Sequence, residues 1–354
     1  MPLDLKASAM DIEIQTLSKE KIPELCDFLI AGFHQPPDAE FAAESVLEWK
    51  YFDSLGITAQ PRSFVGTLNG RIVACIGVCP TWFVIGYPRQ LISASHGIDW
   101  LATKSEVSAG LMVYQRSEED SDVQFAIGGT QQAIAIKKKL GYKFPMQAPT
   151  FCRILRPTSR LRRPREDALW KAAIKVTRDY SRRLLYFRRS PKTHLELRQV
   201  SAFGDEIARI TNACKMPDVH TLRTTELLNH YLRYPKKNIS GWLLMEDNRM
   251  RGFALLSVVQ HQGIRMGRIA DCFMDCLDHD LWHSAIYSLT NQLNVDKADM
   301  VVCYGTTQWM AAALKNGGFY RQKLSPLSLR DPKNLVPSNA SFYLTHLEAD
   351  HAYL

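Results

Sequence analysis

The chain has 354 residues, 46% of them apolar, which is enough for two ordinary domains with a core each. Its net charge is +8, but residues 153–192 hold 14 Lys/Arg against three acids (+11), so the remainder carries 8 − 11 = −3. No window approaches the roughly 20 apolar residues of a membrane-spanning helix, and residues 1–11 lack the apolar stretch of a secretory signal.

The eight cysteines do not have zinc-finger spacing. The closest pairs, Cys75/Cys79 and Cys272/Cys276, are separated by three residues, and no histidine pair stands at finger spacing. Several cysteines lie inside apolar runs, where a small buried thiol is the usual occupant. We therefore expect no metal and a reducing, cytoplasmic location.

The first half begins with an expected strand and two expected helices. Residues 11–16 alternate as a strand, residues 18–32 have a helical apolar face with Ser18 as its cap, and residues 40–52 are again helical. Asn69-Gly70 predicts a hairpin turn. The further elements expected are strands at 63–68, 71–78, 81–85 and 89–101, a helix at 105–116, a strand at 123–127, a helix after Thr130 and a strand at 148–155.

The second half repeats this order, with a second hairpin turn at Asp247-Asn248. Its expected strands are 195–200, 242–246, 250–260, 267–277, 300–304 and 340–346, and its expected helices are 203–214, 224–234, 281–293 and 307–316. The duplicated order is β-α-α-β-β-β-α-β-α-β, which indicates two copies of one fold.

A local repeat supports the duplication. Residues 128–142 align without a gap to residues 305–319, at an offset of 305 − 128 = 177, half of the chain. The matched pairs are Gly128/Gly305, Thr130/Thr307, Gln131/Gln308, Ala135/Ala312, Lys138/Lys315, Gly141/Gly318 and Tyr142/Phe319. Each copy predicts a buried strand, a threonine-capped helix that ends at a glycine, and an aromatic that starts the next extended segment.

This order and the "LGY" and "GGF" endings at residues 140–142 and 317–319 resemble the GCN5-related N-acetyltransferase (GNAT) fold in tandem. Trp49-Lys50-Tyr51 and the basic middle segment are also similar to tandem GNAT-like proteins of surface-polysaccharide gene clusters. The resemblance implies an α/β (α+β) fold, with a mixed, mostly antiparallel sheet flanked by helices in each domain. The implied limits are 1–155 for the first domain, 156–192 for a basic amphipathic linker helix and 193–354 for a degenerate second domain.

The resemblance implies an acyl-CoA-dependent N-acyltransferase. Acetyl-CoA or another acyl-CoA would be the donor, and an amine, such as an amino sugar of a surface-glycan precursor, the acceptor. In that family the splayed fourth and fifth strands hold the pantetheine, and the helix after the fourth strand receives the pyrophosphate. The residues so implied as cofactor-binding are Trp100, Leu101, Ala102, Lys104, Ser105, Val107, Ala109 and Gln131.

The family's loop pattern, Arg/Gln-x-x-Gly-x-Gly/Ala, is matched here in part. Lys104 occupies its first position, Val107 replaces a glycine and Ala109 fits the last position. At the corresponding place in the second half, Asp278 and Asp280 would repel a pyrophosphate. We therefore expect CoA to bind to the first half.

Four residues are catalytic candidates. His96 and Asp99 lie three apart on one expected strand, so that one of them can face the site as a base, with an unperturbed histidine pKa near ~6.5. Asp271 and Asp275 lie four apart on one face and could bind a cationic acceptor. The alternatives are a structural histidine, and aspartates that lie on a solvated edge or pair with a nearby arginine such as Arg265 or Arg268. The family's catalytic tyrosine position falls on Lys137 and Leu314, so neither copy has it.

Residues 167–188 mix basic and aromatic-apolar side chains at helical spacing. The first interpretation is an interdomain helix that packs its apolar stripe on one half. The second is peripheral contact with an anionic membrane, and the third is RNA. Two other functions stay open for the whole chain: a FemAB-like transferase that takes its acyl group from aminoacyl-tRNA, and a non-catalytic scaffold.

Overall fold

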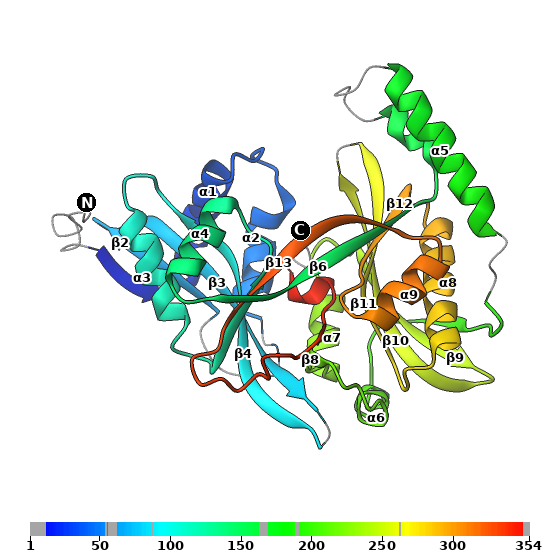
Figure 1. Cartoon of the computed structure of the whole chain (residues 1–354). Helices are drawn as coiled ribbons and strands as arrows, with labels where there is room; N and C mark the ends of the chain where they lie inside the picture. The colour runs from blue at the N-terminus through cyan, green and yellow to red at the C-terminus, as the bar shows by residue number, and fades with distance from the viewer. Residues whose placement is uncertain are drawn as a thin grey trace.

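One mixed β-sheet runs through the whole molecule (Figure 1), in the order β1-β2-β3-β4-β5-β13-β6-β12-β11-β10-β9-β7. The computed structural model describes residues 12–53, 55, 62–86, 88–162, 169–187, 191–261 and 263–349. Helices and strands of the first half are β1 (Ile12–Thr16), α1 (Ile22–Gly32), α2 (Glu44–Tyr51), β2 (Ser63–Leu68), β3 (Arg71–Ile85), β4 (Gln90–Ala102), α3 (Val107–Ser117), β5 (Val123–Ile127), α4 (Gln131–Lys139) and β6 (Lys143–Ile154).

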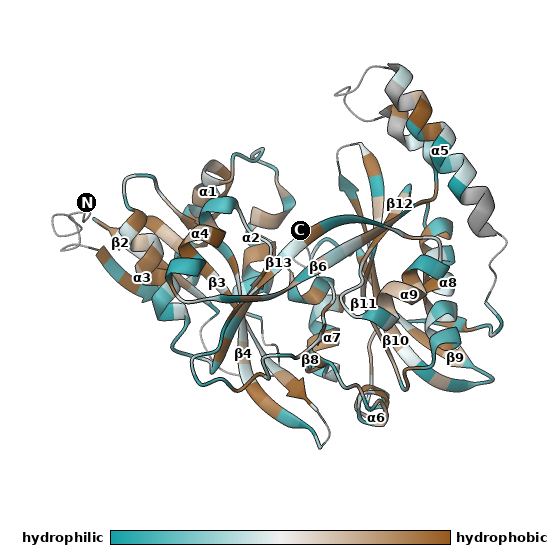
Figure 2. Cartoon of the chain, in the orientation of Figure 1, coloured by the Kyte–Doolittle hydropathy of each residue, from teal (hydrophilic) through white to brown (hydrophobic). Residues whose placement is uncertain are grey.

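A long helix, α5 (Leu169–Phe187), connects the halves. The second half then contains β7 (Glu196–Val200), α6 (Glu206–Ala213), β8 (Val219–Thr221), α7 (Thr225–Leu232), β9 (Ile239–Glu246), β10 (Arg249–His261), β11 (Ile264–Met274), α8 (His279–Val295), β12 (Met300–Tyr304), α9 (Gln308–Asn316), β13 (Tyr320–Arg330) and β14 (Phe342–Tyr343). The fold class and the element order of the first half are confirmed, and the second half adds the short strand β8 between two expected helices. Figure 2 shows hydrophobic and hydrophilic segments alternating along the strands and helices.

Both predicted hairpins are present. Leu68 pairs with Arg71, and Glu246 pairs with Arg249, so each turn contains two residues. Asn69 and Gly70 have positive φ of 50° and 78°, and Asp247 and Asn248 have 47° and 62°. Positive φ at both central positions is the geometry whose twist matches the flanking strands.

Three local predictions were wrong. The last long strand is β13 and not 340–346, of which only Phe342 and Tyr343 form a short strand. β13 opens with an exposed polar run, so its sequence lacks the apolar alternation that indicates a strand. Ser18 makes no side-chain cap bond, because the chain there forms a 3₁₀ turn (Lys19–Lys21) before α1. Residues 71–85 form one strand and not two.

The local repeat has the predicted geometry in both copies. Thr130 Oγ1 accepts a hydrogen bond from Ala133 N at 3.2 Å, and Thr307 Oγ1 accepts one from Met310 N at 3.3 Å. Gly141 and Gly318, just past the two helices, both have φ of +84°. A side chain is disfavoured in this left-handed conformation, which explains why both copies end in glycine.

The two halves exchange their last long strands. β13 of the second half lies between β5 and β6, and β6 of the first half lies between β13 and β12. The exchange follows the 177-residue offset: Ile127 pairs with Leu327 and Tyr304 pairs with Thr150, with 304 − 127 = 327 − 150 = 177. The offset found in the sequence is therefore an approximate two-fold symmetry of the sheet, with β6 and β13 at its centre.

The symmetry extends to the helices that meet between the halves. The indole of Trp49 on α2 stacks on the ring of His230 on α7, with centroids 4.3 Å apart and planes 8° apart, and its Nε1 donates to His230 O at 2.9 Å. Sequence matching places these two residues at equivalent positions of their halves. One apolar core includes Leu47 and Trp49 together with Leu228 and Tyr231, so the halves share a core. Neither half completes its own sheet. The expected domain limits, 1–155, 156–192 and 193–354, therefore stay a proposal about how the sequence is divided.

Candidate functional site

Two pairs of parallel strands separate at equivalent places. β4 and β5 pair only from Ala94–Val123 to His96–Phe125, and β4 then continues to Ala102 without β5. β11 and β12 likewise pair only as far as Arg268–Val302. We call these places the first and the second divergence. A separation of parallel strands leaves unpaired backbone groups that an extended ligand can bind.

Each divergence begins beside a bulge. The pairing of β4 with β3 shifts between Ile98 and Leu101, and Asp99 in this bulge has a φ of +50°. The pairing of β11 with β10 shifts between Ile269 and Asp271. A bulge leaves its extra residue out of the ladder and redirects nearby groups, a feature common beside active sites. It also breaks the strict alternation by which His96 and Asp99 were assigned to opposite faces.

α3 packs closely on the first divergence. Trp100 Nε1 donates to Gly110 O at 2.8 Å, and the Trp100 ring contacts Tyr114 at 4.3 Å. A Cβ on Gly110 would lie 2.8 Å from the Cβ of Ala102, so this glycine allows the close approach. Leu101 packs on the other side, against Gly32 of α1. The side chains of Trp100 and Leu101 are therefore used in packing, and their backbone is what a ligand could reach.

The N-terminus of α3 follows directly after this backbone edge. Glu106, at the cap position, makes no side-chain cap bond, and Val107 is 55% exposed. Lys104 and Ser105 are exposed just before it. The first N–H groups of a helix have no intrahelical acceptor and form an anion site. Of the remaining predicted cofactor residues, Gln131 is exposed at the start of α4, whereas Ala109 is fully buried and only packs.

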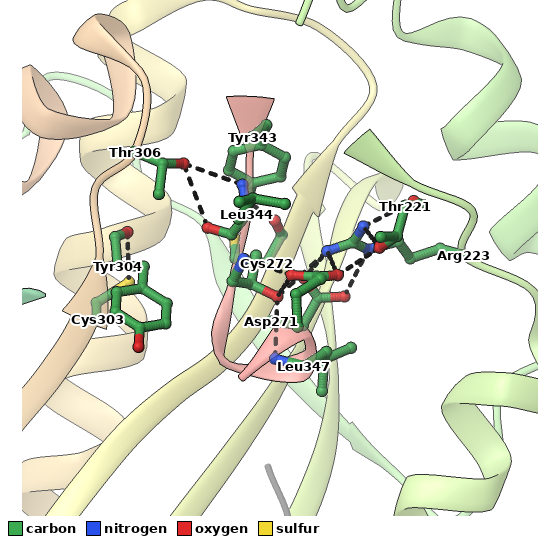
Figure 3. Close-up of polar contacts among 12 residues, drawn as sticks. Thr221, Arg223, Asp271, Cys272, Cys303, Tyr304, Thr306, Tyr343, Leu344 and Leu347 are labelled. Atoms are coloured by element: carbon green, nitrogen blue, oxygen red, sulfur yellow. Dashed lines mark hydrogen bonds and ion pairs between the residues drawn. The ribbon is translucent and has the colours of Figure 1, made fainter. Parts of the chain in front are cut away.

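The second divergence is filled by the chain itself. Tyr343 donates its hydroxyl to Cys272 O on β11, and Leu344 N donates to Thr306 Oγ1, just after β12, at 2.9 Å (Figure 3). The Tyr343 ring also contacts Trp282 and Trp309 at 6.0 and 5.1 Å.

The helix after the second divergence is also closed to an anion. Asp278 caps α8 by accepting from Leu281 N at 2.8 Å, and Asp280 in its first turn pairs with Lys192 at 3.2 Å. Two carboxylates thus occupy the place that a pyrophosphate would take. The two divergences are therefore equivalent in topology and differ in the helix that follows: Asp278 caps α8, whereas Glu106 makes no side-chain cap bond to α3.

Asp271 belongs to a buried ion-pair cluster. Arg223 Nε and Nη2 donate to its two oxygens at 3.2 and 3.1 Å, and Arg223 Nη2 lies 3.0 Å from Glu348 Oε1 (Figure 3). Burial alone would lower the pKa of Arg223, but the two carboxylates raise it. Burial raises the pKa of Glu348. This cluster fixes the C-terminal 3₁₀ turn (His346–Glu348) to β11.

Asp275 has separate partners. Arg251 Nε donates to it at 2.9 Å, and Arg249 lies 3.6 Å away. The alternative of structural pairing therefore fits both aspartates, although with Arg223 and Arg251 in place of Arg265 and Arg268. Asp271 and Asp275 do not form one carboxylate site.

Asp99 is likewise held in place. Lys50 Nζ, whose side chain is 1% exposed, lies 3.0 Å from Asp99 Oδ2, and the Tyr51 hydroxyl donates to the same oxygen at 2.6 Å. The Trp-Lys-Tyr segment of α2 thus supplies one ring to the contact between the halves and two donors to the β4 bulge. Asp99 serves as an anchor for this bulge rather than as an open base.

His96 lies at the last paired position before the first divergence. Its ring stacks on Phe125 at 5.3 Å and lines a cavity of about 30 Å³, roughly the room for one water. Glu348 and Thr221 of the second half line the same cavity. Burial, and then the charge of Lys137, lower the pKa of His96 to about 3. The expectation of an ordinary histidine pKa was wrong, and the imidazole is neutral at physiological pH.

Lys137 lies close enough to His96 to affect its pKa. From the sequence, this lysine was named only as the position where the family's tyrosine is missing. It lies on α4 at the position equivalent to Leu314, is 5% exposed and donates to Ser328 Oγ on β13 at 3.3 Å. An apolar residue at the matching position of the other copy was the available sign that this lysine is buried. Arg223 and Glu348 had no such sign.

Two general features concern the described part of the chain. It contains no group of three His, Cys, Asp or Glu side chains that could hold a metal. Each helix in it is too short or too polar to cross a bilayer.

Comparisons with known proteins agree with this geometry. No protein-family model matches the sequence, and no curated sequence matches it significantly. Three similar solved structures are a GCN5-related N-acetyltransferase from Anabaena variabilis (12% identity, TM-score 0.58, 90% of this chain and 72% of that one), one from Kribbella flavida (11%, 0.56, 90% and 71%), and Saccharomyces cerevisiae N-myristoyltransferase with bound myristoyl-CoA and inhibitors (11%, 0.59, 94% and 84%). The chain therefore has a GNAT-like fold, and at these identities the likeness establishes the fold alone.

Proposed function

We propose that the chain is an acyl-CoA-dependent N-acyltransferase that binds its donor at the first divergence. The observation that carries this is the contrast between the two halves. The second divergence is bridged by Tyr343 and Leu344, and its helix is capped by Asp278. At the first divergence α3 has no side-chain cap, and Lys104 is exposed beside its first turn.

The geometry supports a division of roles. The pyrophosphate of CoA would bind the N–H groups of α3 and Lys104, and the pantetheine would lie along the free edge of β4. The thioester would then lie near the β4 bulge at Asp99, where backbone groups outside the ladder can stabilise an oxyanion. The acceptor amine would attack the thioester carbon, forming a C–N bond, and the C–S bond would break. The proton lost by the nitrogen would pass to the departing thiolate, so that the products are an amide and CoA thiol.

The acceptor would bind where residues of both halves meet, beside the cavity lined by His96, Thr221 and Glu348. Because that cavity has room for about one water, it would admit the amine group, and the rest of the acceptor would stay outside. Polar groups on the cavity wall suit a polar amine, and an amino sugar of a surface-glycan precursor is the first acceptor to test. A cytoplasmic location and a role in polysaccharide biosynthesis are parts of this proposal.

Calorimetric titration with acetyl-CoA and with myristoyl-CoA tests the donor site. We expect wild-type protein to bind at least one of them, and Lys104→Ala to weaken binding by about tenfold, the worth of one charge-assisted contact. Lys192→Ala is the matched control, since Lys192 lies near the equivalent helix start of the second half. Absence of binding to wild-type protein would contradict the enzyme proposal. Equal effects of the two variants would contradict the placement of the donor site at the first divergence.

Release of CoA thiol in the presence of amino sugars then tests transfer. Saturable release that requires both acyl-CoA and one amine supports the reaction. Transfer from aminoacyl-tRNA without acyl-CoA binding would favour the FemAB-like alternative.

A further inference from the structure

Helix α5 exposes three large apolar side chains among those that the structure describes. Trp170, Ile174 and Tyr180 are 62%, 59% and 43% exposed. Ala173 and Thr177, which lie between them at helical spacing, are exposed as well. The expectation that the apolar stripe packs on one half does not hold for these residues.

The opposite face of α5 is the one that contacts the rest of the chain. Asp179 is 2% exposed, and the Arg182 guanidinium lies 4.7 Å from the centre of the Tyr320 ring on β13. A surface helix normally buries its apolar stripe and solvates its charges. Of the α5 side chains that the structure describes, Asp179 and Arg182 lie inward, whereas Trp170, Ile174 and Tyr180 lie toward solvent.

The exposed apolar residues form a local group and not a random scatter. Leu161, 57% exposed, lies in the 3₁₀ turn (Pro157–Arg162) that adjoins α5. Together with the three residues of α5 it makes up half of the strongly exposed large apolar side chains in the described part of the chain. α5 lies at the outer edge of the molecule (Figure 1), where this group is accessible to a large partner.

The charge of the segment indicates what that partner is. Residues 153–192 carry +11, and the remaining chain carries −3. Apolar and aromatic residues with a surrounding excess of Lys/Arg are typical of helices that lie in the interface of an anionic bilayer. RNA would use the charges but would leave the exposed Trp170 and Ile174 in water, whereas a bilayer surface takes up both the charges and the apolar side chains.

We propose that α5 docks this protein on the surface of an anionic lipid membrane. With 19 residues, the helix is about 28 Å long and would lie parallel to the bilayer, with Trp170, Ile174 and Tyr180 inserted at the headgroup level. Leu161 would extend the inserted patch. Residues 167, 168 and 188, at the ends of the segment expected to contact a membrane, lie outside the described residues. This proposal does not depend on acyltransferase activity.

Flotation of the full-length protein with lipid vesicles tests it. We expect binding to vesicles of phosphatidylcholine with 30% phosphatidylserine, and at least tenfold weaker binding to pure phosphatidylcholine. The triple variant Trp170→Ser/Ile174→Ser/Tyr180→Ser should lose at least tenfold in binding to the anionic vesicles. Because these side chains are exposed, its thermal unfolding should match that of the wild type.

The matched control is Leu91→Ser/Val295→Ser/Leu324→Ser, which removes three similarly exposed apolar residues elsewhere. It should bind vesicles as the wild type does. Raising the salt from 0.1 to 1 M shortens the Debye length from about 10 to about 3 Å and should weaken wild-type binding. Failure to bind anionic vesicles, equal loss in both triple variants, or a tRNA complex in place of vesicle binding would each overturn the proposal.

Discussion

Three of the buried histidines have pKa values that favour the neutral ring in the folded state. Burial lowers the pKa of His96 to about 3, of His220 to about 4 and of His230 to about 2. The folded state therefore binds fewer protons than the unfolded state below about pH 6.5. Above that pH, the neutral rings make their whole contribution to the free energy of unfolding. The contribution is lost as the pH falls toward the pKa values that these histidines have in the folded state.

His230→Phe isolates one of these groups, because Phe can keep the stack on Trp49 without titrating. Between pH 6 and 5, we expect the slope of unfolding free energy against pH to become shallower by up to about 1.4 kcal/mol per pH unit. Urea unfolding at several pH values measures it, with exposed His194→Phe as the control. An unchanged slope in the first variant would contradict the assigned pKa shift.

The sequence indicated which residues lie near the candidate site but not what each of them does there. His96 and Lys104 lie at the first divergence, where the resemblance placed them. Asp99 and Asp271 lie at the two bulges, but their partners, Lys50 and Arg223, come from 49 and 48 residues away. Ion pairs over such distances depend on the assembled fold, so the sequence showed two carboxylates near a site and could not show that both were already neutralised.

Among the elements, the C-terminal segment around β14 decides which half is open. Tyr343 and Leu344 bridge the strands of the second divergence, and Arg223 holds the following turn through Glu348. A buried ion cluster costs much to desolvate and is destabilising when one partner is removed. The closed state of the second half therefore depends on this cluster.

Arg223→Met tests this dependence by leaving two carboxylates buried without their cation. We expect a loss of about 3–5 kcal/mol in unfolding free energy, and partial recovery in Arg223→Met/Asp271→Leu/Glu348→Leu. Urea denaturation measures both. Arg251→Met, at a more exposed pair, should cost less. A cost below about 1 kcal/mol for Arg223→Met would show that the cluster does not hold the segment.

Elements with strong local patterns were found from the sequence, and elements defined by distant partners were not. The buried strands β5 and β12, the two hairpins and the capped helices α4 and α9 match their predicted positions closely. β13 was missed because its exposed residues give no period-two pattern, and β8 is only three residues long. Their positions follow from pairing with strands far away in the chain.

At the scale of the molecule, the halves are joined by exchanged strands and a common core. On its side toward the centre of the sheet, β5 pairs with β13 of the second half, and β12 pairs with β6 of the first half. The sequence repeat predicted the duplication but not this exchange, since a repeat is equally compatible with two independent sheets. The shared core around Trp49 and His230 adds a second connection.

Separation of the chain between residues 165 and 166 tests this interdependence. We expect fragments 1–165 and 166–354 to co-purify as a 1:1 complex when co-expressed, because each supplies a strand to the other. Either one expressed alone should lack cooperative unfolding by circular dichroism. A cooperatively folded, monomeric fragment 1–165 would show that β13 is dispensable to the first half.

The strand exchange also has a consequence for biosynthesis. Ile127 and its partner Leu327 are 327 − 127 = 200 residues apart, so β5 leaves the ribosome long before β13 exists. At about 5–20 residues per second, the nascent first half waits roughly 10–40 s with an unpaired strand edge. Translation speed and chaperone supply, rather than final stability, would then limit the yield of correctly assembled protein.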